Sequence, residues 1–166
     1  MSRALGYHLV KSTYGQWLPG DEQIGYLEPH MLHPGDPVRQ RMAEERMRCQ
    51  PLWMTDQMMT IVRESLAECA DRSDGDLTID AVTIESTHFH LLIPCSGRDI
   101  NKTAKWLADQ TAKAIHCRTS YRGPVWCKGK WCTYVFERSH WDNSRVYIER
   151  HNARRHAREK ASPHPL

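Results

Sequence analysis

The stretch Glu85-Ser86-Thr87-His88-Phe89-His90-Leu91-Leu92-Ile93, residues 85–93, decides the fold of this chain. A short polar break is followed by a mostly apolar run, which predicts a strand. Because successive side chains of a strand point to opposite faces, His88 and His90 are expected on one face and Phe89 in the core on the other. We therefore predict a strand over residues 88–93 that carries two neighbouring imidazoles.

Patterns on both sides of this stretch predict the rest of the sheet and its helices. The expected order is strand 7–14, an irregular connection over 15–37, helices 38–48 and 55–71, strands 77–84 and 88–93, helix 100–116, one or two short strands within 125–136, and a last helix through Tyr147. This order favours an α+β fold, an antiparallel β-sheet with helices packed on its faces.

Two of the expected helices carry an apolar stripe at three- and four-residue steps, the spacing of one helix face. The stripes are Met58, Ile61, Val62, Leu66 and Cys69 in one helix, and Ile100, Ala104, Leu107, Ala108, Thr111 and Ile115 in the other. We expect the second of these helices to cover the sheet. Asp142 or Asn143 is the expected N-cap of the last helix.

Length and composition fit one domain over residues 1–166, with a short basic tail from about residue 153. The first residues lack the apolar core of a signal peptide, and no apolar run is long enough to cross a membrane. A cytoplasmic protein with reduced cysteines is therefore expected. A structural zinc site from Cys117, Cys127, Cys132 and His116 would have unusual ligand spacing, so it is not favoured.

The net charge of +3 is concentrated near the C-terminus. Between Arg145 and Lys160 six basic residues stand against two acidic ones. A local excess of positive charge is what a polyanionic partner would require, whereas the small net charge alone would not indicate one.

The pair His88 and His90 has the spacing of metal ligands on a strand. Two neutral imidazoles with an open coordination sphere would form a Lewis acid site, but such a site needs a third ligand. Taken alone, two histidines on a polar sheet face are the commoner explanation.

Tyr147 and His151 change this balance. Four residues apart on a helix, they lie on one face about one turn from each other. This arrangement would supply a phenol nucleophile and a third metal ligand together. Without the histidines, Tyr147 would be interpreted as an amphipathic tyrosine packed on the sheet.

These residues resemble the single-tyrosine HUH transposases of bacterial insertion sequences, including the relatives associated with repetitive extragenic palindromes (REP). The resemblance covers most of the chain. Residues 7–10 and 13–21 look like the family's first strand and the loop after it, and residues 85–93 look like its metal strand. Residues 102–115 look like the helix that follows the metal strand. Residues 125–126 and 147–152 look like the final strand and the catalytic helix. The chain departs from many relatives in having Ser86-Thr87 before the first histidine and His151-Asn152 after the tyrosine.

The resemblance implies a ferredoxin- or RRM-like HUH nuclease fold and a metal-dependent enzyme. Tyr147 would cleave and rejoin single-stranded, hairpin-bearing DNA through a 5′-phosphotyrosine intermediate. Mg²⁺ or Mn²⁺ would be held by His88, His90 and His151, with Asn152 as the alternative third ligand. Relatives include dimers and monomers, so both states stay open here.

Contacts with single-stranded DNA are expected from basic side chains on phosphates and aromatic faces under unstacked bases. The candidates are Lys11, Arg122, Lys128, Lys130, Trp131, Arg154 and Arg155. Two other classes of protein remain as alternatives. One is a DNA-binding protein, inactive or domesticated, that has lost catalysis, and the other is a metal-dependent hydrolase that uses a bound water.

Overall fold

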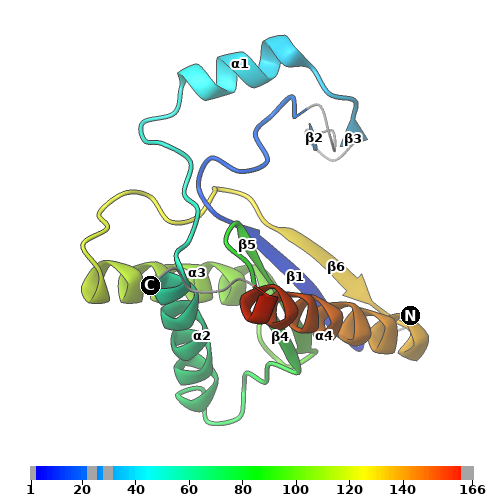
Figure 1. Cartoon of the computed structure of the whole chain (residues 1–166). Coiled ribbons are helices and arrows are strands. Elements are labelled where there is room, and N and C mark those ends of the chain that lie inside the picture. Colours follow the sequence, from blue (N-terminus) through cyan, green and yellow to red (C-terminus); the bar gives the residue numbers. More distant parts are fainter. Residues whose placement is uncertain (1–2, 22–25, 28–31, 162–166) are drawn as a thin grey trace.

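The strand with the two histidines, β5 (His88–Pro94), lies inside the main sheet of the protein. The computed structural model describes residues 3–21, 26–27 and 32–161, and its four-stranded sheet has the order β4-β5-β1-β6. The other strands are β1 (Gly6–Ser12), β4 (Ala81–Ile84) and β6 (Trp131–Val135), and each neighbouring pair is antiparallel. The expected α+β fold with an antiparallel sheet is confirmed (Figure 1).

Helices α2 (Asp56–Asp71) and α3 (Ile100–Arg118) cover one face of this sheet. Each helix starts at a side chain that caps it, Thr55 accepting from the Met58 N–H and Asp99 from the Lys102 N–H. All residues of the two predicted stripes are buried. Most of them form the main core together with sheet residues such as Leu9, Phe89 and Leu91.

Helix α4 (Arg138–Ala161) crosses the other face of the sheet (Figure 1). Its Trp141 and Ile148 are buried against Leu92 and Val135 in a second, smaller core. The predicted N-cap was wrong, because the helix already begins at Arg138. The extra turn brings the Trp141 ring onto the sheet, where it contributes to this second core.

Other boundaries differ from the predictions by a few residues. Strand β1 ends at Ser12, and Thr13 forms an isolated bridge with Trp126. Strand β4 begins only at Ala81, although Leu77 is buried in the main core. In both cases the alternation continues beyond the end of the regular strand pairing, so the sequence pattern overstates the strand length.

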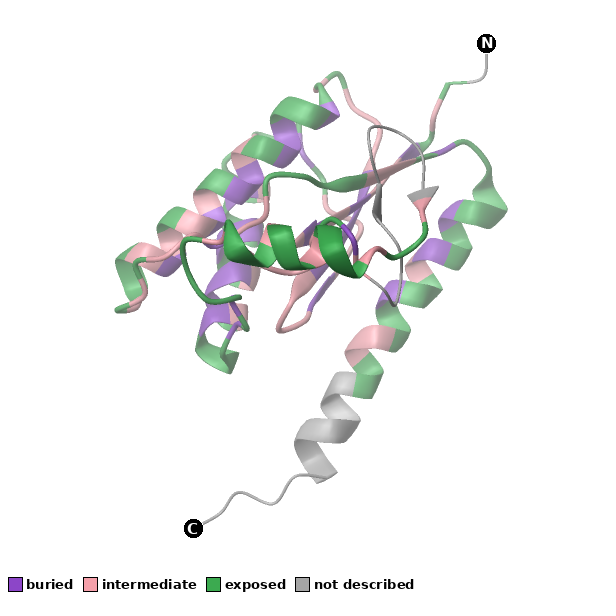
Figure 2. Cartoon of the chain, turned by 90° about the horizontal axis from the view of Figure 1, so that it is seen from above, coloured by how far each residue is buried: buried purple, intermediate pink, exposed green. Residues whose placement is uncertain are grey.

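The segment predicted as an irregular connection contains two short strands, β2 (Tyr26–Leu27) and β3 (Leu32–His33), which pair with each other. Helix α1 (Pro37–Glu45) follows, with Asp36 as its N-cap. None of the α1 residues is buried, and Figure 2 shows most of the helix as exposed. In the described part of the chain, no helix is long and apolar enough to cross a membrane.

Candidate active site

The register of the sheet places both histidines of β5 on the face that α4 covers. Val10 in β1 is the partner of His90, and Ser12 is the partner of His88. The two imidazole rings are neighbours, 4.8 Å apart between centroids. Phe89 points the other way and is fully buried in the main core. The predicted division of these side chains between the two faces is confirmed.

Helix α4 brings Tyr147 and His151 to the same place. Their rings lie 4.6 Å apart between centroids, as expected for residues one helical turn apart. The His90 ring lies 5.5 Å from the Tyr147 ring and 5.6 Å from the His151 ring. The buried Ile148 holds this turn of the helix against the sheet. Four residues that the sequence singled out therefore form one cluster.

Each histidine of the cluster has a polar partner at its Nδ1 atom. His88 Nδ1 lies 3.0 Å from Thr87 Oγ1, and His90 Nδ1 lies 3.0 Å from His8 Nε2. His151 Nδ1 lies 3.5 Å from Glu85 Oε1. An imidazole whose Nδ1 is engaged in this way presents its Nε2 atom for another role, which is the usual arrangement of metal-binding histidines.

The Nε2 atom of His90 is buried and has no hydrogen-bond partner among the described residues. Burial lowers the pKa of His90 to about 3, with further lowering from His88, His8 and His151. Burial also lowers the pKa of His88 and of His8. These imidazoles are therefore neutral near pH 7, and neutral imidazole is the form that binds a metal.

The chemistry of this donor set fits a divalent metal, because it offers neutral imidazoles and a buried nitrogen without a partner. Even so, within the described part of the chain no group of three or more His, Cys, Asp or Glu side chains is arranged to hold a metal ion. The three imidazoles are thus neighbours and do not form a coordination shell in this structure.

The two alternatives for the third ligand lie side by side on α4 but differ in their surroundings. His151 contacts the His90 and Tyr147 rings and is near Glu85. Asn152 donates from Nδ2 to the Val82 carbonyl at 2.9 Å, and its Oδ1 is buried with no hydrogen-bond partner in the described part of the chain. The ring contacts favour His151, while the unpartnered Oδ1 keeps Asn152 as the alternative.

A charged contact ties α4 to the sheet beside the cluster. The Arg145 guanidinium pairs with the Asp80 carboxylate, which directly precedes β4. Arg145 is two residues before Tyr147, so this ion pair helps to fix the rotation of the helix that carries the phenol. In the sequence, Arg145 stands out only as one of the basic residues near the C-terminus, and no local pattern indicates this ion pair.

Among the candidate DNA contacts, Trp131 lies on the site face of the sheet. Its register partner is Val10, which also pairs with His90 from the other side of β1. Trp131 is 53% exposed, so it is not a core residue. An exposed indole on this face is available for stacking.

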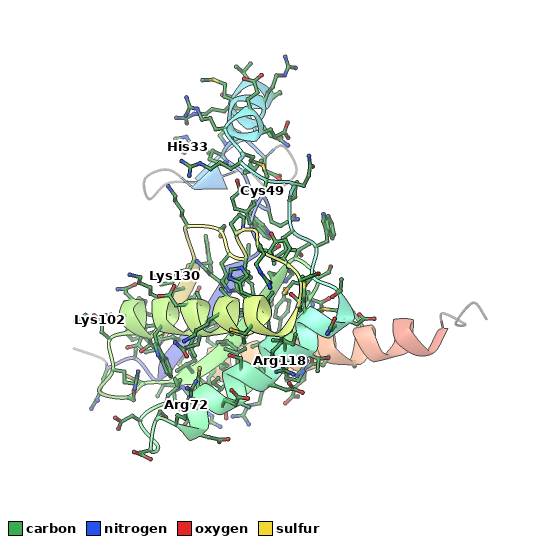
Figure 3. The ribbon with its side chains drawn as sticks, turned by 90° about the vertical axis from the view of Figure 1, so that its left-hand side faces the viewer. His33, Cys49, Arg72, Lys102, Arg118 and Lys130 are labelled. Carbon is green, nitrogen blue, oxygen red and sulfur yellow. The ribbon has the colours of Figure 1, made fainter. Side chains whose placement is uncertain are left out.

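The lysines of the loop before β6 are exposed. Lys130 donates to Asn101 Oδ1 at 2.7 Å, which ties the loop to the first turn of α3, and Lys128 is exposed nearby in the sequence. Figure 3 places Lys130 and Arg118 toward opposite ends of α3.

Two other predicted DNA contacts have structural partners instead. Lys11 is buried, and its Nζ donates to the carbonyls of Cys127 and Gly129, each at 2.7 Å. Arg122 donates to the carbonyls of His116, Thr119 and Tyr121 at the end of α3. Both cations therefore hold loops in place. The Lys11 ammonium is engaged by the carbonyls of the 127–129 loop in this structure, and its contact with DNA stays a prediction.

The last two candidates lie on α4 beyond the cluster. Arg154 is exposed. The side chain of Arg155 lies outside the part of the chain that the structure describes. The six cysteines are free, as expected for reduced thiols, and the described residues hold no zinc cluster.

Sequence reasoning missed His8 and Thr87, the partners of His90 and His88. His8 lies in the predicted first strand, and its alternation places it on the same face as Val10. Nothing in the sequence, however, gives the register that sets β1 beside β5. Thr87 directly precedes His88, so the sequence could have indicated its hydroxyl as a hydrogen-bond partner of the His88 ring.

Comparisons with known proteins support the architecture. No protein-family model and no curated protein matches the chain. The chain is similar to a solved structure of the REP-associated tyrosine transposase bound to a REP hairpin, with a TM-score of 0.50 and 10% identity over 89% of this chain and 67% of that chain. It is also similar to a candidate transposase from Deinococcus radiodurans R1, with a TM-score of 0.48 and 15% identity over 91% of this chain and 93% of that one. The chain thus has the fold of the REP-associated tyrosine transposase structure, which confirms the HUH architecture that the sequence resemblance implied.

Proposed function

We propose that this protein is a single-tyrosine DNA strand transferase of the HUH kind, which cleaves and rejoins single-stranded DNA. The observation that carries the proposal is the cluster of Tyr147 with three histidines, each of which has its Nδ1 atom beside a polar partner. A tyrosine packed on the sheet for structural reasons would not require this set of imidazoles around its ring.

Tyr147 is the proposed nucleophile. Its side chain is 47% exposed, so a DNA strand can reach the phenol oxygen while the ring stays against the histidines. The phenolate oxygen would attack the phosphorus of a phosphodiester, and the bond from phosphorus to the 3′ oxygen would break. The 3′ oxygen leaves as a hydroxyl after taking up a proton, and the 5′ phosphate stays on Tyr147. The reverse attack by a 3′-hydroxyl rejoins the strand without a nucleotide cofactor, because the phosphoester bond is exchanged and not hydrolysed.

His88 and His90 would hold a divalent metal, Mg²⁺ or Mn²⁺, together with His151 or Asn152. When bound, the metal would neutralise charge on the scissile phosphate and orient it for in-line attack. The fold of the chain would hold these ligands and the phenol in fixed positions. Strand β5 fixes two imidazoles on a rigid sheet, and Ile148 and Arg145 fix the helix that carries the phenol.

Single-stranded DNA with a hairpin is the proposed substrate. The similar REP-associated transposase is bound to a REP hairpin, and the fold similarity makes this class of DNA the first to test. Trp131 would stack an unpaired base next to the site, and the exposed Lys128, Lys130 and Arg154 would contact phosphates.

A covalent-adduct assay tests the proposal. The protein is incubated with hairpin-bearing single-stranded DNA, labelled on the 3′ side of the expected cleavage point, and with Mg²⁺ or Mn²⁺. We expect a labelled protein–DNA adduct that Tyr147→Phe abolishes. The matched control is Tyr134→Phe, because Tyr134 has a similar exposure of 48% but lies on the opposite face of β6. Cleavage without an adduct would favour a hydrolase, and binding without cleavage an inactive DNA-binding protein.

A further inference from the structure

The imidazole of His8 is a polar partner of His90 that lies outside the predicted metal-binding set. His8 is in β1, where its register partner is Leu92, so it lies on the same sheet face as His90. The distance from His8 Nε2 to His90 Nδ1 is 3.0 Å, and the two ring centroids are 5.2 Å apart. This contact joins the two central strands of the sheet directly beneath α4.

A hydrogen bond between two neutral imidazoles needs one N–H and one lone pair. In the first arrangement, His90 Nδ1–H donates to His8 Nε2, and the lone pair of His90 is on Nε2. In the second, His8 Nε2–H donates to His90 Nδ1, and the proton of His90 is on Nε2. That second arrangement buries an N–H with no acceptor, because His90 Nε2 has no partner among the described residues. Burying an unpaired donor is costly, so the first arrangement is favoured.

We infer that His8 is a positioning residue that fixes the tautomer and the ring orientation of His90, so that the Nε2 lone pair is directed into the Tyr147 cluster. His8 would act through His90 and would not itself contact the metal or the phosphate. The inference deepens the proposed function, on which it rests for the identity of the ligand. Its structural part, the tautomer of His90, is a property of the metal-free protein.

The surroundings of His8 fit this role. Its ring centroid is 6.3 Å from that of Tyr147, so the two imidazoles and the phenol pack together. On the other side of β1 its register partner is Thr133. In metal sites, removal of a partner that orients a histidine through its second nitrogen commonly weakens metal binding by roughly 10- to 100-fold.

Two substitutions separate orientation from simple packing. His8→Leu keeps an apolar side chain of moderate size but removes the acceptor. His8→Gln keeps a carbonyl oxygen that can accept from His90 Nδ1–H. His140→Gln is the matched control, because it removes an exposed imidazole that is not a hydrogen-bond partner of His90.

The first readout is the tautomer of His90 in ¹⁵N-labelled, metal-free protein at about pH 8, above the ordinary pKa of histidine. Long-range ¹H–¹⁵N correlation spectra distinguish Nδ1–H from Nε2–H, and His90→Asn assigns the signals. We expect His90 to be Nδ1-protonated in the wild type, the His8→Gln variant and the His140→Gln variant, and to become a mixture in His8→Leu.

The second readout is Mn²⁺ affinity without DNA, measured by electron paramagnetic resonance. We expect His8→Leu to raise the Mn²⁺ dissociation constant about 10- to 100-fold, and His8→Gln to recover most of this loss. An Nε2-protonated His90 in the wild type would overturn the inference, as would unchanged Mn²⁺ affinity in His8→Leu. If His8→Leu does not fold, the wild-type tautomer still decides.

Failure of the proposed strand transferase activity and failure of the proposed role of His8 give different results. An absent Tyr147 adduct with an Nδ1-protonated His90 and a His8-dependent Mn²⁺ affinity would reject the strand transferase and retain the role of His8. A Tyr147 adduct with a His90 tautomer that does not depend on His8 would do the reverse.

Discussion

The ring of Tyr147 lies 5.5 Å from the ring of His90, although the two residues belong to different layers of the protein, α4 and β5. Both layers are held by other contacts, with Ile148 buried against the sheet and Phe89 buried in the main core. The meeting of phenol and imidazole is therefore a property of how the helix docks on the sheet.

The third ligand can be identified by comparing His151 with Asn152. We expect His151→Ala to weaken Mn²⁺ binding about 10-fold or more, because it removes an imidazole of the cluster. We expect Asn152→Ala to lower the free energy of unfolding by about 1 kcal/mol, because it removes the hydrogen bond to the Val82 carbonyl. Titration with Mn²⁺ and urea unfolding of both variants give the answer. Weaker Mn²⁺ binding in Asn152→Ala alone would make Asn152 the ligand instead.

The metal-free protein should lose stability as the pH falls. The pKa of His90 is lowered to about 3 in the folded protein from an ordinary value of 6.5. Between these values the unfolded chain binds a proton that the folded chain does not, so protonation favours unfolding. The stabilisation that the folded protein gains from a neutral His90 is complete above about pH 6.5 and is lost as the pH falls toward 3.

Urea unfolding in the presence of a chelator, from about pH 7 down to about pH 5, measures this effect. We expect the unfolding midpoint to fall over this range in the wild type and to fall less in His90→Gln. The lowered pKa values of His8 and His88 act in the same direction. A midpoint that rises as the pH is lowered contradicts the assignment of a buried neutral imidazole.

Gly6 is required by the docking of α4. An added Cβ atom would lie 2.3 Å from the Trp141 ring and 2.3 Å from the Ile93 carbonyl oxygen. We expect Gly6→Ala to destabilise the protein by about 1–3 kcal/mol, because the ring and the strand must both move. Gly97→Ala is the control, since an added Cβ meets nothing within 4 Å there. Thermal unfolding of both variants measures the difference, and equal melting temperatures would refute the close approach.

Trp131 should contribute to single-stranded DNA binding through stacking. We expect Trp131→Ala to weaken binding of hairpin-bearing DNA by about 1–3 kcal/mol, the usual contribution of one base–aromatic stack. Tyr134→Ala is the matched control, because this exposed aromatic lies on the same strand but on the opposite face. Fluorescence anisotropy with a labelled oligonucleotide measures both. A larger loss for Tyr134→Ala would move the DNA to the other face of the sheet.

Local patterns were enough to predict the main elements of the fold. The stripe from Met58 to Cys69 and the stripe from Ile100 to Ile115 are buried as expected, because apolar spacing along one helix determines which side faces the core. The N-cap of α4 could not be predicted in this way. Its position depends on the packing of Trp141 against the sheet, and local capping residues at 142 and 143 gave a misleading signal.

For the candidate site, the sequence by itself determined that His88 and His90 share a face and that Tyr147 and His151 lie one turn apart. Both statements follow from the periodicity of a single strand and a single helix. Only the tertiary structure decided that these two pairs meet, that His8 is hydrogen-bonded to His90, and that Lys11 is buried. The reason is physical: strand register and helix docking are set by contacts between residues far apart in the chain, and no local pattern records which strands become neighbours.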